Sequence, residues 1–135
     1  MATWHDLVNF IRREYEVIRD EPDEIRIRIA YGEDDDVQQR TQTVVVAREI
    51  MDGREDWIQI ASPFAMVDQV DLTRVLEEIG TTTIVGGAVI MGPYLVLRHS
   101  LPLLNLDINE FVDPLELVTG AAEDLEQIFT GRDDY

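Results

Sequence analysis

The feature that most constrains the fold is a strict alternation of large apolar and other side chains early in the chain. Residues 24–31 read Glu-Ile-Arg-Ile-Arg-Ile-Ala-Tyr, so that every second side chain is a bulky apolar one. A period of two places successive side chains on opposite faces of a strand, and this segment therefore predicts a half-buried β-strand. Because one strand cannot bury such a face alone, the pattern also requires a sheet with a covering layer.

Two further strands follow and form a hairpin. The segments 40–51 and 56–62 are rich in β-branched and aromatic residues, as strands are. Between them lies Asp52-Gly53, a strong signal for a two-residue type I′ turn, which needs positive φ at both positions. We expect an antiparallel meander of three strands, with the acidic stretch Gly32–Asp36 as the turn between the first two.

Three segments have the spacing of an amphipathic helix. We expect the first over 3–19, the second over 71–79 with Gly80 as its C-cap, and the third from Asp113-Pro114 to about Gly131. Asp as N-cap, Pro at the first position and Glu at the third are typical of a helix start. The apolar stripe of the first helix consists of Trp4, Leu7, Val8, Ile11, Tyr15 and Ile18.

Two more strands are expected between the second and third helices, over 82–91 and 93–100. Within the earlier one, Gly86-Gly87 predicts a bulge or a close backbone approach. This strand is apolar on both faces, which fits either a buried central strand or a sheet covered by a second subunit or helix. The predicted order is α-β-β-β-α-β-β-α, a twisted antiparallel sheet flanked by helices in one α+β domain over residues 1–135.

Composition limits the classes of function. Asp and Glu number 28 against 11 Lys and Arg, for a net charge of −17. A field this negative repels nucleic acid and anionic lipid and favours solubility and basic partners. The chain has no Cys, which excludes disulfides and thiolate chemistry, and it shows neither a signal peptide nor an apolar run of membrane-spanning length. We expect a soluble cytoplasmic protein without nucleic-acid or membrane partners.

No catalytic or metal-binding pattern stands out. His5 and His99 are the only histidines, and neither has a second ligand at metal-binding spacing. The acidic run 33–36 lacks the spacing of a calcium-binding loop, and Gly86-Gly87 precedes neither a helix nor a lysine. No serine lies in a glycine-flanked elbow. We therefore expect no enzyme activity, no catalytic residue, no cofactor and no metal.

The element order and the acidity together resemble the type III secretion chaperone-like fold, and within it the bacterial YbjN-like family of sensory transduction regulators. The resemblance spans residues 3–130 and rests on pattern. Its carriers are the opening helix with Trp4, Leu7 and Phe10, the meander with Trp57, the helix over 71–79, and the closing stretch from Leu101-Pro102-Leu103 to Phe129.

This resemblance implies a homodimer that holds an extended segment of a partner in apolar grooves and on sheet edges. In chaperones of this fold the middle helix and a nearby strand often build the dimer. The corresponding dimer residues here are Leu72, Val75, Leu76, Ile79, Val85 and Val89. The partner contacts implied in the same way are Leu7, Ile11, Ile27, Ile29 and Trp57.

We therefore expect a non-enzymatic chaperone-like protein or regulatory adaptor, whose acidic surface steers a basic or apolar partner segment towards it. Two alternatives stay open. An acidic mimic of nucleic acid would bind a basic protein and would carry its carboxylates in a stripe along one face. A small-molecule-binding enzyme would have a deep polar pocket around His99 or His5.

Overall fold

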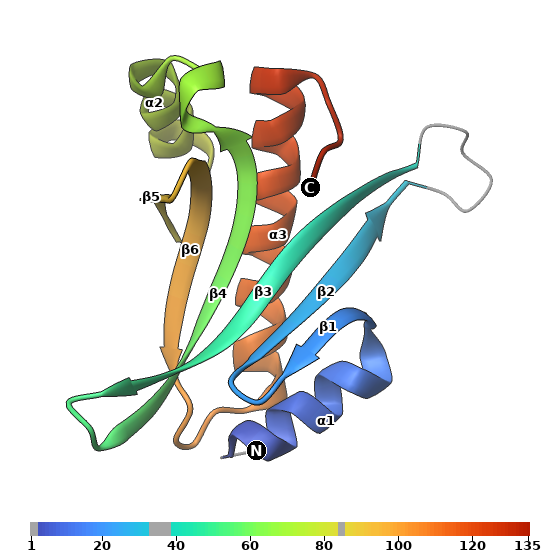
Figure 1. The fold of residues 1–135 in the computed structure, drawn as a ribbon, viewed down its shortest axis with the longest axis vertical. Coiled ribbons are helices and arrows are strands. Elements are labelled where there is room, and N and C mark those ends of the chain that lie inside the picture. Colours follow the sequence, from blue (N-terminus) through green and yellow to red (C-terminus); the bar gives the residue numbers. More distant parts are fainter. Residues whose placement is uncertain (1–2, 33–38, 84–85) are drawn as a thin grey trace.

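A computed structural model describes residues 3–32, 39–83 and 86–135 and shows an α+β fold (Figure 1). The predicted class, an antiparallel sheet flanked by helices, is confirmed. In these ranges the elements are α1 (Trp4–Glu14), β1 (Glu16–Glu21), β2 (Glu24–Tyr31), β3 (Arg40–Met51), β4 (Glu55–Met66), a 3₁₀ turn η1 (Val67–Gln69), α2 (Leu72–Thr82), β5 (Gly87–Met91), β6 (Tyr94–Pro102) and α3 (Ile108–Thr130).

The six strands form one sheet in the order β1-β2-β3-β4-β6-β5. Its longest strands, β3 and β4, have 12 residues each and meet at the turn predicted from Asp52-Gly53. Both turn residues have positive φ, 53° and 66°, as a type I′ turn requires. The strand β3 begins and ends where its sequence predicts, and its buried side chains alternate at Gln42, Val44 and Val46.

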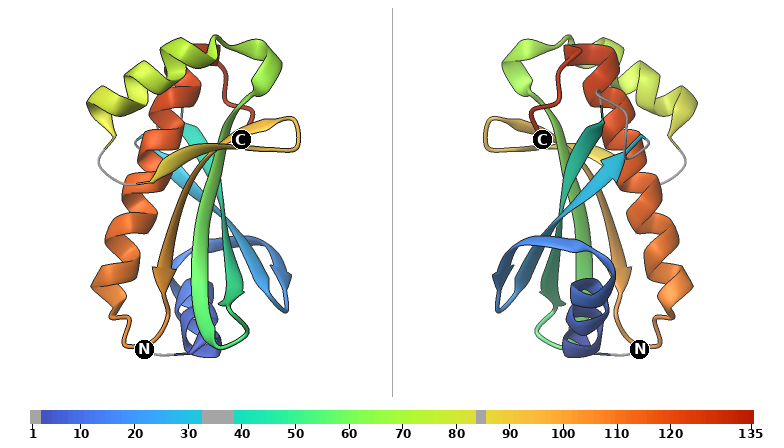
Figure 2. Two further views of the ribbon diagram at one scale, coloured as in Figure 1. Left: turned by 90° about the vertical axis from the view of Figure 1, so that its left-hand side faces the viewer. Right: turned by 90° about the vertical axis from the view of Figure 1, so that its right-hand side faces the viewer.

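The helices cover one face of the sheet. In Figure 2, α3 lies along one side of the strands, whereas no helix of the described residues lies on the opposite side. Helix α1 joins the same core, where the rings of Phe10 and Phe111 stand edge to face with centroids 6.3 Å apart. The strand residues that point into this core are fully buried; among them are Ile25, Ile27, Val44, Val46, Ile58 and Ile60. Removal of these side chains from water is the main favourable term that holds the layers together.

The first helix is shorter than its stripe predicts, and β1 takes up its last part. Tyr15 is already extended, with φ −132° and ψ 157°. From Glu16 the chain pairs antiparallel with β2. Arg12 of α1 holds Asp20 of β1 through two hydrogen bonds of 2.7 and 3.1 Å. The prediction of helix to residue 19 was wrong because backbone pairing with the neighbouring strand outweighs a weak local helix preference.

The last helix begins six residues earlier than the Asp-Pro pattern predicts. Asp107 is its N-cap, and the Asp107 backbone N–H donates to Glu110 Oε1 at 3.0 Å. The early start buries Phe111 completely. Pro114 consequently lies inside the helix, where it removes one backbone hydrogen bond near the N-terminal end. At the other end Gly131, with φ 66°, is the C-cap, as its position predicts.

Strand β5 lies at the edge of the sheet, which excludes a buried central strand, one of the two interpretations that its sequence left open. Gly86 has φ 90°, and a Cβ on it would lie 3.0 Å from the Arg98 carbonyl oxygen, which confirms the predicted close backbone approach. Gly80 is not a cap: α2 continues past it, and the Thr83 backbone N–H donates to the Ile79 carbonyl at 3.0 Å. The predicted turn at residues 33–36 lies outside the described residues.

Candidate functional site

The uncovered face of the sheet is the first candidate site. Strand pairing places Arg26, Val45, Ala61 and Arg98 in one row across it, because directly paired residues of an antiparallel sheet share a face. The composition of this row is mixed, whereas the covered face one residue along carries Ile25 and Ile27 in β2 and Ile58 and Ile60 in β4. A sheet face that carries apolar residues and no covering layer offers contact area to another chain.

A groove of about 560 Å³ runs over this open face. Its floor is mainly apolar, with Val45, Ala61, Pro63 and Val96, and it also holds the polar side chains of Thr43 and Gln59. Glu24 and Arg26 of β2 line it on one side, and Met91 and Tyr94 of the β5–β6 hairpin line it on the other. We call this feature the sheet groove.

The residues after α3 close part of the sheet groove. Asp134 and Tyr135 contribute to its lining. The ring of Tyr135 packs edge to face on that of Tyr94, with centroids 6.0 Å apart and planes at 88°. This geometry is a favourable aromatic contact. The chain itself therefore places an aromatic side chain into the groove.

A buried carboxylate cluster holds this segment. Glu123 and Glu126 of α3 are 4% and 0% exposed, and their carboxylate oxygens lie within 4.8 Å of one another and of Asp133. Arg40 of β3 pairs with Glu123 and, at 3.8 Å, with Glu126. The Asp134 backbone N–H donates to Glu126 Oε2 at 2.7 Å, and the Thr41 backbone N–H donates to Asp133 at 3.2 Å.

Burial changes the protonation of this cluster. Burial, together with the neighbouring charges of Asp133 and Glu123, raises the pKa of Glu126 to about 7. Burial also raises the pKa of Glu123, although its pairing with Arg40 acts in the opposite direction. Glu126 Oε1 and Glu123 Oε2 are buried without a hydrogen-bond donor among the described residues, which fits a preference for the neutral form.

The same three carboxylates could offer oxygen ligands to a cation. Arg40, however, lies among them and already supplies a positive charge. A guanidinium and a metal ion at one site would repel each other. We therefore interpret the cluster as an ion-pair network that anchors the segment after α3.

The structure separates the residues that the sequence assigned to partner contacts. Leu7, Ile11 and Ile27 are 0% exposed, and Ile29 packs against the same core, so the three buried side chains present no surface to a partner. They were assigned from an apolar pattern that cannot tell a core from an interface. Trp57 alone lies on the open face, in the row with Glu49 and Pro102, beyond the sheet groove.

The residues assigned to a dimer are divided in the same way. Val75 is 1% exposed and belongs to the core, which corrects that assignment, and Ile79 packs against the core. Leu72 and Leu76 are 39% and 58% exposed on α2. Val89 is half-buried on the edge strand β5, opposite Val96. Val85 lies outside the described residues.

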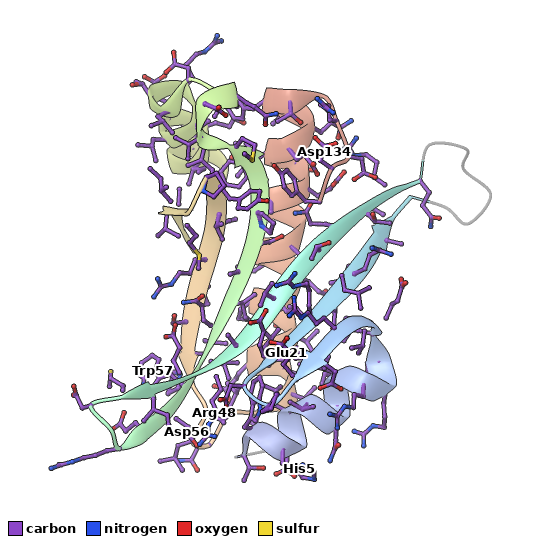
Figure 3. All side chains as sticks on the ribbon, in the orientation of Figure 1. His5, Glu21, Arg48, Asp56, Trp57 and Asp134 are labelled. Carbon is purple, nitrogen blue, oxygen red and sulfur yellow. The ribbon has the colours of Figure 1, made fainter. Side chains whose placement is uncertain are left out.

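The histidines do not join the sheet groove. His5 is exposed on α1, and its Nε2 lies 3.1 Å from the Asn9 side-chain amide. His99 pairs with Ile60, which points into the core. In Figure 3 His5 lies at one end of the molecule with Arg48 and Asp56, whereas Asp134 lies near the opposite end of α3. These polar groups do not converge on one site.

The carboxylate cluster was missed at the sequence level, although a signal for it exists. Glu123 and Glu126 each directly follow a buried residue of the α3 stripe, Ala122 and Leu125. Acids at the border of an apolar stripe are candidates for partial burial and need a partner. Their partner Arg40 lies 83 residues from Glu123, so no local pattern identifies it.

Comparisons with known proteins add no assignment. Neither a scan against models of protein families nor a search of curated proteins found a match for this chain. No helix in the described part of the chain is long and apolar enough to cross a membrane.

Proposed function

We propose that this protein is a non-enzymatic binding protein, a chaperone-like protein or regulatory adaptor, that holds a segment of a partner protein in the sheet groove. The observation that carries the proposal is the uncovered sheet face with its apolar floor. An extended segment matches such a surface because its alternate side chains reach the floor. The edge strand β5, beside the groove, adds backbone groups available for pairing.

The same proposal includes a homodimer built on α2 and β5. The two elements contact each other, and together they carry the exposed apolar residues Leu72, Leu76, Ile90 and Met91. Apolar side chains gathered at one end of a molecule are typical of an interface between subunits. Met91 also lines one side of the sheet groove, so this interface would border the groove, whereas Leu72 and Leu76 of α2 are not part of its lining.

Site-specific photocrosslinking tests the binding proposal. The photoreactive residue p-benzoylphenylalanine replaces Tyr94, which lines the groove, or Leu104, which is 73% exposed and does not line it. After irradiation in lysate of the host cell, we expect a discrete crosslinked protein from position 94 and none from position 104. Adding Val45→Glu, which places a charge on the groove floor, should abolish the crosslink while the protein stays folded.

Equal crosslinking from both positions, or a crosslink that survives Val45→Glu, would contradict binding in the sheet groove. A crosslink from position 104 without one from position 94 would place the binding site outside the sheet groove. Circular dichroism of each variant verifies that its fold is intact before the crosslinks are compared.

A further inference from the structure

The segment after α3 turns back and crosses towards the open face. Gly131 reverses the chain with φ 66°, and its backbone N–H donates to the carbonyls of Gln127 and Glu126 at 3.1 and 3.2 Å. Arg40 then donates to the Arg132 carbonyl oxygen. With the bonds that Asp133 and Asp134 make to Thr41 and Glu126, these contacts guide Tyr135 to the sheet groove.

The groove complements the chemistry of this segment. Its apolar floor and Tyr94 receive the ring of Tyr135. Arg26, which also lines it, has a buried Nε without a hydrogen-bond partner among the described residues, although its Nη2 binds Glu24 at 3.0 Å. Buried guanidinium donors are usually paired, most often with a carboxylate or a carbonyl. Glu24 and Asp134 also line the groove, so the feature that favours an acceptor there is the unpartnered Nε of Arg26 among the described residues and not a net positive charge.

We infer that the sheet groove recognises a protein segment with an aromatic side chain next to a carboxylate, and that Asp134 and Tyr135 occupy it as an internal competitor. The inference rests on the proposed function and deepens it by naming the chemistry of the partner. It departs from the sequence-based expectation of a basic segment, because the buried Nε of Arg26, without a partner among the described residues, favours an acceptor oxygen there.

An internal segment competes at an effective concentration on the order of millimolar. A partner therefore binds the intact protein more weakly than the empty groove, by a factor set by the ratio of this effective concentration to the segment's own dissociation constant. Removing the Tyr135 side chain should free the groove while leaving the anchors on Arg40, Thr41 and Glu126 in place.

Fluorescence polarisation with a labelled peptide tests this. The probe is a fluorescein-labelled Gly-Arg-Asp-Asp-Tyr peptide, added to the full-length protein and to its Tyr135→Ala variant. We expect the variant to bind the probe at least about tenfold more tightly than the parent protein does. Arg26→Gln in the Tyr135→Ala background should remove most of that affinity, whereas Arg13→Gln, at an exposed arginine on α1, should not.

Two further peptides define the specificity. Replacing both Asp by Lys, or Tyr by Ser, should weaken binding to Tyr135→Ala by tenfold or more. Equal binding to the parent protein and the variant would overturn the internal competition, and a tighter Lys peptide would overturn the acidic preference. In either case the photocrosslink from position 94 could still succeed with a basic partner, so failure here is distinguishable from failure of the proposed function.

Discussion

Neighbouring residues of a strand lie on opposite faces of the sheet, and the two faces of this sheet differ in their exposure and in their chemistry. On the covered face Val44 is fully buried between strands and helices, whereas its neighbour Val45 is half-buried in the floor of the sheet groove. A valine thus contributes to stability on the covered face, and the next valine along the strand contributes contact area on the open face. The difference teaches that this sheet uses alternation to separate folding from recognition, because successive side chains of a strand point in opposite directions.

The largest expected effect tests that division directly. Val44→Ala should lower the free energy of unfolding by roughly 2–3 kcal/mol, because it leaves a cavity in a close-packed core. Val45→Ala should lower it by less than about 1 kcal/mol, because the site already borders an open groove. Urea unfolding followed by circular dichroism measures both. Equal losses would mean that the open face is as tightly covered as the other.

The second prediction concerns the segment that links the two faces. The pKa of Glu126 is raised from 4.5 to about 7, so the folded protein binds this proton more tightly than the unfolded chain does. The resulting stabilisation is present below pH 4.5 and is lost as the pH rises to about 7. Ionised Glu126 would face Glu123 on its own helix, Arg40 from β3, and Asp133, Asp134 and Tyr135 from the segment after α3.

We expect the free energy of unfolding to fall by on the order of 2 kcal/mol between pH 5 and pH 7.5. Glu126→Gln keeps an oxygen that can accept from the Asp134 N–H and carries no charge, so it should flatten this dependence and stabilise the protein at pH 7.5. Urea unfolding at each pH gives the comparison, and an unchanged slope in the variant would assign the dependence to other groups.

The smallest expected effect on stability concerns α2, whose exposed residues belong to neither face of the sheet. Leu76→Arg should change the free energy of unfolding by no more than about 0.5 kcal/mol, because this side chain is exposed. If α2 builds the homodimer, the dimer dissociation constant should rise at least about tenfold, as for a charge placed in an apolar contact. Light scattering after size-exclusion chromatography measures it.

Leu104→Arg, at an exposed leucine outside α2 and β5, is the matched control and should leave the dimer intact. A dimer that persists in Leu76→Arg at normal stability would exclude α2 as its interface. The sheet groove would then be the next surface to test for self-association.

Much of the fold could be predicted from local patterns. Strand β3 has the bounds that its β-branched residues and the following turn indicate, the turn at Asp52-Gly53 has the positive φ values that its residues favour, and Asp71 caps α2. Each of these rests on residues within a few positions of one another. The α+β class follows from the same signals, because strands and helices of these lengths pack in only a few layered arrangements.

The candidate site could be predicted far less well. Trp57 was the only assigned partner residue that lies on the open face, and Leu7, Ile11 and Ile27 proved to be core. An apolar stripe identifies a buried face without saying whether a helix of the same chain or a partner covers it. Arg132 and Asp133 are held by Arg40 and Thr41 from the other half of the chain, and no local pattern predicts these contacts.

The sequence by itself determined the strands and helices that rest on strong periodicity, the tight turn, and the absence of thiol chemistry. Only the tertiary structure decided that residues 16–21 form a strand, that β5 is an edge, and that one face of the sheet carries no helix of the described residues and has Tyr135 lying on it. The physical reason is range. Periodicity and capping act over a few residues, whereas strand pairing, burial and the bond between Arg40 and Glu123 join segments that no local pattern relates.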